Sequence, residues 1–322
     1  MRLGVHRPDT NRYLMATRLN SFRRAGRSVA EAIRAAAKVE GLSALELNYP
    51  QHIDQLEPGE LEGLIDETGL RLTALNLRFD GSEFASGAFT SPSAEARRTA
   101  LGIAYDAVDL AARFDARHVV LWMADDGWDY PLQVDYARLW DAEVSAVRLV
   151  ADRNPDVRVS IEYKAVEPRR RSLIGSMGEA LLAAREVDRP NVGMTLDFCH
   201  SLMAGESPAA AAALALRHDR LFGLHLNDGY GVADDGLMVG SVRPAQLLEL
   251  LIVLRRGGYD GTMYFDTFPV REVPAAECET NIGTLLRFLA LAERLDGDEL
   301  SGILGRHDAV AARRLLGEVG IA

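Results

Sequence analysis

Charged side chains follow an apolar stretch in the segment VRVSIEYKAVEP, residues 157–168. Glu162 and Lys164 are two positions apart, and side chains two apart on a strand point to the same side of a sheet. Charged side chains are rarely buried unless they are paired or bind a metal ion. The segment therefore predicts either an ion pair at the end of a strand or one part of a catalytic site.

Three later predicted strands also end in polar side chains. The strand within 191–200 carries Asp197 and His200, the strand within 221–228 carries His225, and the strand within 261–268 carries Asp266. Each step from Glu162 onward is about one strand–helix repeat, so one side chain per strand would converge at one end of a barrel. Carboxylates that close repel one another unless a cation binds between them. The pattern predicts a divalent-metal site formed by Glu162, Asp197, His225 and Asp266.

The set of ligands indicates the kind of metal. Three carboxylates with one imidazole suit a hard or borderline divalent ion. Zinc usually takes more nitrogen or sulfur ligands. We therefore expect Mn²⁺, with Mg²⁺ or Co²⁺ as alternatives.

Strand and helix patterns alternate along the chain. Strands are predicted at 14–20, 44–50, 70–79, 118–123, 157–164, 191–200, 221–228 and 261–268, and helices at 29–39, 58–69, from 94, and at 135–153, 176–187, 207–217, 243–255 and 275–295. Eight such units predict an α/β fold, a (β/α)₈ TIM barrel over residues 1–296. The tail, 297–322, predicts a C-terminal helical extension that acts as a lid or an oligomer arm. A doubly wound open sheet is the alternative, but no GxGxxG turn follows a predicted strand.

The composition narrows the classes of function. The 322 residues carry a formal net charge of −11, so a nucleic-acid partner is not expected. The chain has no run of about 18 apolar residues, and its first residues lack the apolar core of a signal peptide, so no membrane partner is expected. Two cysteines make neither a disulfide framework nor a zinc motif, which fits a reducing, cytoplasmic setting.

Several segments resemble xylose isomerases. EYKAVEPR at 162–169 is similar to that family's Glu-x-Lys followed by Glu-Pro, DFCH at 197–200 to its acidic residue and histidine, FDTFPVR at 265–271 to its last-strand Phe-Asp-x-x-Pro-x-Arg, and DDGLMVG at 234–240 to its second-metal loop. The use of His225 and the loop GAFTSPSAEARRTALG at 87–102 look more like the bacterial L-rhamnose isomerase branch. The resemblance spans about residues 14–290 and identifies a xylose-isomerase-like TIM barrel of the sugar isomerase and epimerase family.

The resemblance implies a metal-dependent aldose–ketose isomerase, a homodimer or homotetramer. The substrate would be an open-chain, unphosphorylated sugar of four to six carbons, in which a hydride shifts between C1 and C2. Lys164 would stabilise the carbonyl oxygen, and Glu162 would bind the metal beside it. His200, with Asp234 or Asp235, would hold a second ion or an activated water that moves the hydroxyl proton. If the second site is empty, a carboxylate base and an enediol would replace the hydride shift.

The sequence departs from the family in two places. Gly236 stands where the second-metal loop usually has an acidic residue. The segment at 76–84, NLRFDGSEF, lacks the family's ring-opening histidine, and His52 lies elsewhere. Either another group opens the ring or the substrate is already open.

Four further residues are candidates for binding the substrate. Trp122, at the end of its strand, would pack against the apolar face of a sugar, with core packing as the alternative. Glu167 would contact a residue of the metal site or be a solvated charge. Arg18 and Asn20 end the first strand and would contact sugar hydroxyls.

Other activities on the same scaffold stay open. A ketose 3-epimerase uses a last-strand Glu as an acid/base where Asp266 stands here, and a metal-assisted lyase or deglycosylating enzyme is also compatible. A DNA-repair nuclease would need more histidine ligands and a basic face. A non-catalytic sugar-binding protein fits a complete set of metal ligands least well.

Overall fold

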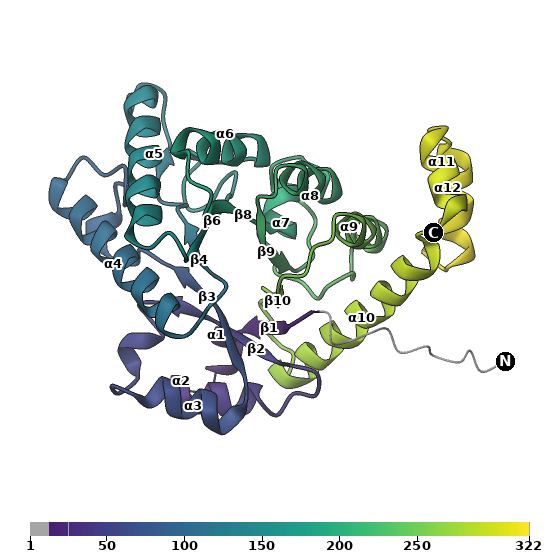
Figure 1. Cartoon of the computed structure of the whole chain (residues 1–322), viewed down its shortest axis with the longest axis horizontal. Helices are drawn as coiled ribbons and strands as arrows, with labels where there is room; N and C mark the ends of the chain where they lie inside the picture. The colour runs from purple at the N-terminus through teal and green to yellow at the C-terminus, as the bar shows by residue number, and fades with distance from the viewer. Residues whose placement is uncertain (1–12, 25, 322) are drawn as a thin grey trace.

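A computed structural model describes residues 13–24 and 26–321 of the chain, so the first twelve residues of the predicted barrel domain lie outside the described residues. Parallel strands close into a barrel in the order β1-β10-β9-β8-β6-β4-β3-β2 (Figure 1). The prediction of a (β/α)₈ barrel is confirmed. The barrel strands are β1 (Met15–Arg18), β2 (Ala44–Tyr49), β3 (Arg71–Leu77), β4 (His118–Trp122), β6 (Arg158–Glu162), β8 (Val192–Asp197), β9 (Leu221–Leu226) and β10 (Met263–Phe265).

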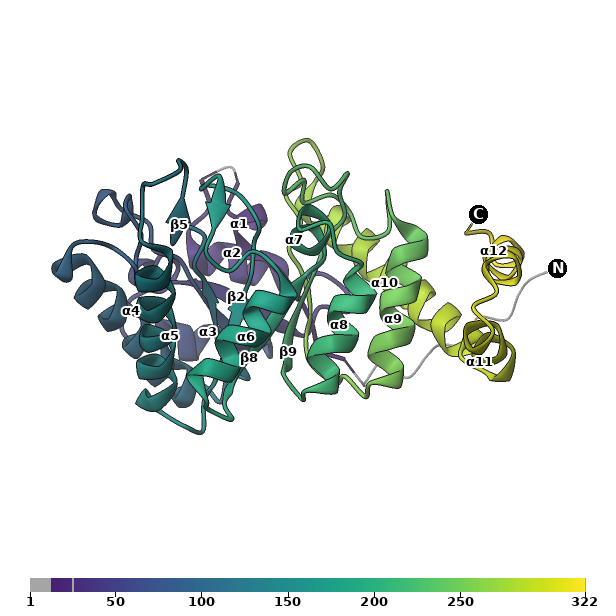
Figure 2. The same ribbon diagram turned by 90° about the horizontal axis from the view of Figure 1, so that it is seen from above.

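Helices form a layer around the outside of the strands (Figures 1 and 2). Helices follow the barrel strands, and after β1, β2, β3 and β8 a short turn of helix comes first; this turn follows β1 and β8 directly. The helices are α1 (Leu19–Phe22), α2 (Val29–Ala36), α3 (Glu60–Thr68), α4 (Ala94–Arg113), α5 (Tyr136–Arg153), α6 (Met177–Val187), α7 (Phe198–Met203), α8 (Pro208–Arg217), α9 (Pro244–Arg256) and α10 (Pro274–Leu295), with 3₁₀ turns at Ile53–Gln55 and Ser82–Phe84.

Side-chain caps and a glycine mark several helix ends. Ser28 and Glu31 form a capping box at the start of α2, and Ser93 accepts a hydrogen bond from the backbone of α4, which satisfies amide groups that the helix itself cannot pair. Gly69 ends α3 in the left-handed conformation at φ 68°. These caps fix where each helix begins or ends, and so fix the lengths of the loops that lead to the strands.

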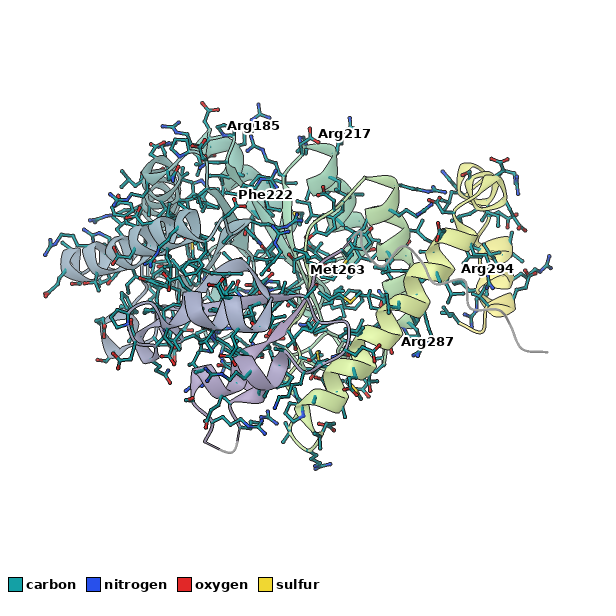
Figure 3. All side chains as sticks on the ribbon, turned by 60° about the horizontal axis from the view of Figure 1, so that its bottom comes forward. Arg185, Arg217, Phe222, Met263, Arg287 and Arg294 are labelled. Carbon is teal, nitrogen blue, oxygen red and sulfur yellow. The ribbon has the colours of Figure 1, made fainter. Side chains whose placement is uncertain are left out.

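The core lies between the strands and the helices. Every residue of β8 and β9 is buried, as expected for parallel strands covered on both faces. Figure 3 shows Arg185, Arg217, Arg287 and Arg294 on the outer helices, with Met263 in the interior, and Met263 is fully buried. Burial of this apolar layer holds the strand ends at fixed positions.

Register brings the predicted site residues side by side. Trp122 pairs with Glu162 across β4 and β6, and Asp197 pairs with His225 across β8 and β9. Below them, a ring nitrogen of His118 lies 2.8 Å from the Ser160 hydroxyl, so the barrel interior is partly polar. Register therefore sets the spacing between the predicted ligands.

Two elements lie outside the barrel. The short strands β5 (Gly127–Trp128) and β7 (Arg171–Ser172) pair antiparallel in the loops that follow β4 and β6. The tail forms α11 (Asp298–Gly305) and α12 (Ala309–Glu318), which lie beyond the end of α10 at the side of the molecule (Figures 1 and 2). The role of this tail as a lid or an oligomer arm stays a prediction. Within the described residues, no helix combines the length and apolar character needed to cross a membrane.

Candidate active site

The structure brings the four predicted metal ligands together. Glu162 ends β6, Asp197 ends β8, His225 lies in β9, and Asp266 directly follows β10. One ligand atom from each of these buried side chains lies within 4.8 Å of the others. The strands β6, β8, β9 and β10 are consecutive in the barrel, so their carboxyl ends meet at one edge.

A second group adjoins the first and shares Asp197 with it. Asp197, His200 and Asp234 also place one ligand atom each within 4.8 Å of one another. The backbone amide of His200 donates to the Asp197 side chain, which caps α7, and His200 Nε2 lies 3.2 Å from Asp234 Oδ2. Asp234 comes from the loop between β9 and α9, so this loop completes the second group.

Asp235, the alternative ligand, is not brought to either group. Its carboxylate accepts a hydrogen bond from the backbone amide of Tyr230, which connects two positions of the loop between β9 and α9. At Gly236, with φ +56°, a Cβ atom would lie 2.3 Å from the ring of Phe268. The position that carries an acidic residue in xylose isomerases therefore has no room for a side chain here.

Lys164 lies between the two groups and the loop after β6. Its Nζ is 2.9 Å from Asp234 Oδ2 and 3.3 Å from Glu167 Oε2, and it lies over the Trp122 ring. Burial lowers the pKa of Lys164, but Asp234 and Glu167 outweigh burial and raise it. The lysine is therefore a charged hydrogen-bond donor aimed at the site.

The electrostatics of the cluster fit a cation. Burial, together with the nearby carboxylates of Asp234 and Glu162, raises the pKa of Asp197 to about 7. Burial lowers the pKa of His200, but Asp197 and Asp234 outweigh it and raise this pKa to about 9. His200 Nδ1 and Asp234 Oδ1 are buried without a hydrogen-bond partner among the described residues. Without a metal, the protons on Asp197 and His200 supply the positive charge that a divalent ion would supply. The unpartnered His200 nitrogen and Asp234 oxygen are both atoms that commonly bind such an ion.

One buried residue beside the predicted ligands was missed by the sequence analysis. Glu46 in β2 is buried, and its Oε2 lies 3.3 Å from His225 Nε2. Asn76 donates to the same oxygen at 3.4 Å. On its other side, His225 Nδ1 is 3.1 Å from Glu162 Oε1. The glutamate inside the apolar strand ALELNY is the signal that could have pointed to it.

Asn227 also supports the ligands. Its side-chain amide donates to Asp197 Oδ2 at 3.0 Å and to the backbone carbonyl of Asp266 at 3.3 Å. Its own carbonyl oxygen accepts from the backbone amide of Cys199. Asn227 therefore ties the ends of β8 and β10 together.

The predicted substrate residues have different surroundings. Arg18 Nη1 lies 2.6 Å from Asp266 Oδ1, and its guanidinium stacks on Phe268. Trp122 is half-buried, with Arg78 stacked on its ring at 4.5 Å. Glu167 keeps 45% of its side chain exposed while it contacts Lys164. Trp122, Arg18 and Glu167 all lie next to the metal-ligand cluster or its lysine.

Asn20 is held by His52. His52 Nδ1 accepts from the backbone amide of Asn48, so Nε2 carries the proton and donates to Asn20 Oδ1 at 2.6 Å. Burial and the nearby arginines Arg23 and Arg18 lower the pKa of His52 to about 3. His52 is therefore neutral, both of its ring nitrogens are hydrogen-bonded, and it positions Asn20.

Residues 33–290 match the family described as Xylose isomerase-like TIM barrel, and the chain belongs to this family. A curated relative, the xylose isomerase of Thermus thermophilus, is 30% identical over 259 residues. The match covers 77% of this chain and 66% of that enzyme, so the chain spans slightly less than two thirds of its length. The resemblance to the L-rhamnose isomerase branch stays a prediction.

Two solved structures show the same fold. D-allulose 3-epimerase from Methylomonas sp., in complex with D-allulose, superposes with a TM-score of 0.68 at 17% identity and covers 87% of this chain and 97% of its own. The 3-keto-D-glucoside 4-epimerase from E. coli superposes with a TM-score of 0.63 at 18% identity and covers 85% and 98%. At this identity the likeness concerns the fold.

Proposed function

We propose that the protein is a metal-dependent aldose–ketose isomerase that acts on an open-chain, unphosphorylated sugar. The observation that carries this proposal is the Lys164 ammonium held beside a buried cluster of three carboxylates and an imidazole. The 30% identical relative named xylose isomerase supports the same reaction class. The sugar is the partner proposed for this site.

Glu162, Asp197, His225 and Asp266 would hold the first divalent ion, which we propose to be Mn²⁺. Bound there, the ion supplies Lewis-acid polarisation of a substrate carbonyl and neutralises the carboxylates. The second group, Asp197, His200 and Asp234, offers fewer ligands because Gly236 contributes none.

Lys164 acts on the carbonyl oxygen of the substrate. Its charged ammonium donates a hydrogen bond to the oxygen that becomes negative as the neighbouring carbon receives hydrogen. Asp234 and Glu167 keep the lysine protonated, and Asp234 fixes the direction of its Nζ. The lysine thus stabilises charge that develops in the transition state.

His200 and Asp234 handle the proton of the neighbouring hydroxyl. Burial would raise the pKa of Asp234, but the contacts with His200 and Lys164 lower it well below its ordinary value. Asp234 is therefore an acceptor at rest, next to an imidazole that can carry a proton at Nε2. This pair provides a path for the hydroxyl proton while hydrogen moves between C1 and C2 within the substrate.

A ketose 3-epimerase is the second candidate, favoured by the epimerase structures of the same fold. That reaction needs two carboxylates that alternate as acid and base. Asp266 stands at one of these positions, and its carboxylate is engaged in an ion pair with Arg18 at 2.6 Å. This contact favours the isomerase.

The experiment is a screen of metal-stripped protein, with Mn²⁺ added back, against paired aldoses and ketoses in D₂O, followed by NMR. Metal-dependent aldose–ketose exchange with little deuterium in the product supports the isomerase. Deuterium confined to C3 would establish the epimerase. Turnover only of glycosidic or oxidised sugars would move the proposal to a lyase or deglycosylating enzyme.

A further inference from the structure

A small cavity lies behind the candidate active site, between helix α5 and the end of strand β6. Glu162 and Lys164 line it on the side of the site, and Glu143 of α5 and Ser172 of β7 line it on the other side. It offers about 10 Å³ to the centre of a water-sized molecule, which is the space of one water. Four apolar side chains complete its wall: Met123, Ala124, Ile161 and Ile174.

Three buried polar atoms at this cavity have no hydrogen-bond partner among the described residues. These atoms are Oε1 and Oε2 of Glu143 and the hydroxyl oxygen of Ser172. Glu143 is only 1% exposed and Ser172 only 8%. Buried polar atoms nearly always find a partner, and a buried water typically serves two to four of them. Three such atoms around a space for one water define a solvent site.

Asp126, whose charge acts on Glu143, has other hydrogen-bond partners. Asp126 uses its carboxylate to accept from the backbone amides of Ala88, Phe89 and Thr90, which holds the loop before α4. Burial, reinforced by the charge of Asp126, raises the pKa of Glu143 well above its ordinary value. This shift favours the neutral carboxyl, in which Glu143 offers one O–H donor and acceptor oxygens to the cavity.

The other side of the cavity is part of the active site. Glu162 uses Oε1 toward His225 at 3.1 Å and toward His200 at 3.5 Å, and its side chain also lines the cavity. The backbone amide of Ser172 donates to the carbonyl of Ala165, so β7 is tied to the segment that carries Lys164. A water bound to Glu143 and Ser172 would therefore reach both the predicted metal ligand and the support of the lysine.

We infer that Glu143 is a positioning residue for the active site: its carboxyl group and the Ser172 hydroxyl hold one buried water that hydrogen-bonds Glu162. This inference rests on the proposed function, because it takes Glu162 as a metal ligand. Carboxylates that ligate a metal are commonly oriented by such outer hydrogen bonds. The helix α5, outside the barrel, is thereby connected to the metal site inside it.

The test compares Glu143→Gln, which keeps a donor and an acceptor, with Glu143→Met, which keeps the length of the side chain and removes both. Mn²⁺ affinity is measured by calorimetry on metal-stripped protein. We expect Glu143→Met to bind about 10–100-fold more weakly, Ser172→Ala to weaken binding by less, and Glu143→Gln to stay close to the wild type. Val147→Ala, one turn along the same buried face of α5, is the control for loss of helix packing.

The inference would be overturned if Val147→Ala weakened Mn²⁺ binding as much as Glu143→Met does. It would also be overturned if Glu143→Gln and Glu143→Met lost the same Mn²⁺ affinity. A crystal structure of the metal-free wild type gives an independent readout. An ordered water within hydrogen-bond distance of Glu143, Ser172 and Glu162 supports the inference, and a dry cavity overturns it. Neither readout uses turnover. A protein that isomerises no sugar would therefore overturn the proposed function, whereas this inference would still be decided by the ordered water and the Mn²⁺ affinities.

Discussion

Lys164 and Asp234 are 70 positions apart in the chain, yet Nζ lies 2.9 Å from Oδ2. The lysine follows strand β6, and the aspartate belongs to the loop after β9. The same Asp234 oxygen lies 3.2 Å from His200 Nε2. One carboxylate oxygen thus contacts both an ammonium and an imidazole, which brings the three side chains together at the site.

Replacing Lys164 by methionine tests its role in turnover. Lys164 is in neither group of metal ligands, so Mn²⁺ affinity should stay near the wild-type value in calorimetry. The donor to the substrate carbonyl is lost, so kcat should fall by about 10²–10³, as for removal of one donor to a developing oxyanion. Retained isomerase activity would remove the lysine from the mechanism, and lost metal binding would make it a structural group.

Replacing Glu46 by glutamine tests the support of His225. Glu46 Oε2 lies 3.3 Å from His225 Nε2, and such a carboxylate orients a metal-binding imidazole and raises its basicity. We expect Mn²⁺ affinity to fall by about 10–100-fold. Glu57→Gln makes the same charge change at an exposed position and serves as control. An unchanged affinity in Glu46→Gln would assign the pair to stability alone.

Metal binding should depend on pH because protons occupy the ligands. The pKa of His200 is raised to about 9, and the pKa of Asp197 to about 7. At pH 7 an incoming ion must displace these protons, so Mn²⁺ affinity rises as pH rises from 7 to 9. Calorimetry in buffers with different ionisation enthalpies counts the protons released, and we expect at least one at pH 7 and fewer at pH 9. Binding without proton release would contradict this protonation of the cluster.

The sequence predicted the fold and the convergence of the four candidate ligands for a common reason. Strand–helix alternation fixes a parallel barrel, and a parallel barrel places the ends of consecutive strands together. Asp197 and His225 could therefore be brought together from their positions at strand ends, and they are in fact in register. The chain order of strands carried this information.

The contacts that the sequence analysis did not foresee depend on packing and backbone conformation. Glu46 and His225 meet across the interior of the barrel from strands that are not neighbours. At Gly236 the ring of Phe268 occupies the space that a side chain would need, and sequence spacing does not show such a contact. The carboxylate of Asp235 turned to its own loop, which depends on backbone conformation. The position of a residue at a strand end does not predict these contacts.

Glu143 should make the metal-free protein less stable as pH rises. Its pKa in the folded protein is raised well above 4.5, chiefly by burial, so above pH 4.5 the folded state keeps a proton that the unfolded state releases. Stability then falls with rising pH, by at most about 1.4 kcal/mol per pH unit until the folded-state pKa is reached. Glu143→Gln has no ionisable group at this position. Urea unfolding should therefore show that the variant gains stability relative to the wild type as the pH rises from 5 to 8. The exposed Glu57→Gln control should follow the wild type, since other groups titrate alike in all three proteins. Parallel profiles for wild type and Glu143→Gln would mean that Glu143 is ionised in the fold, with a cation rather than a water as its partner in the cavity.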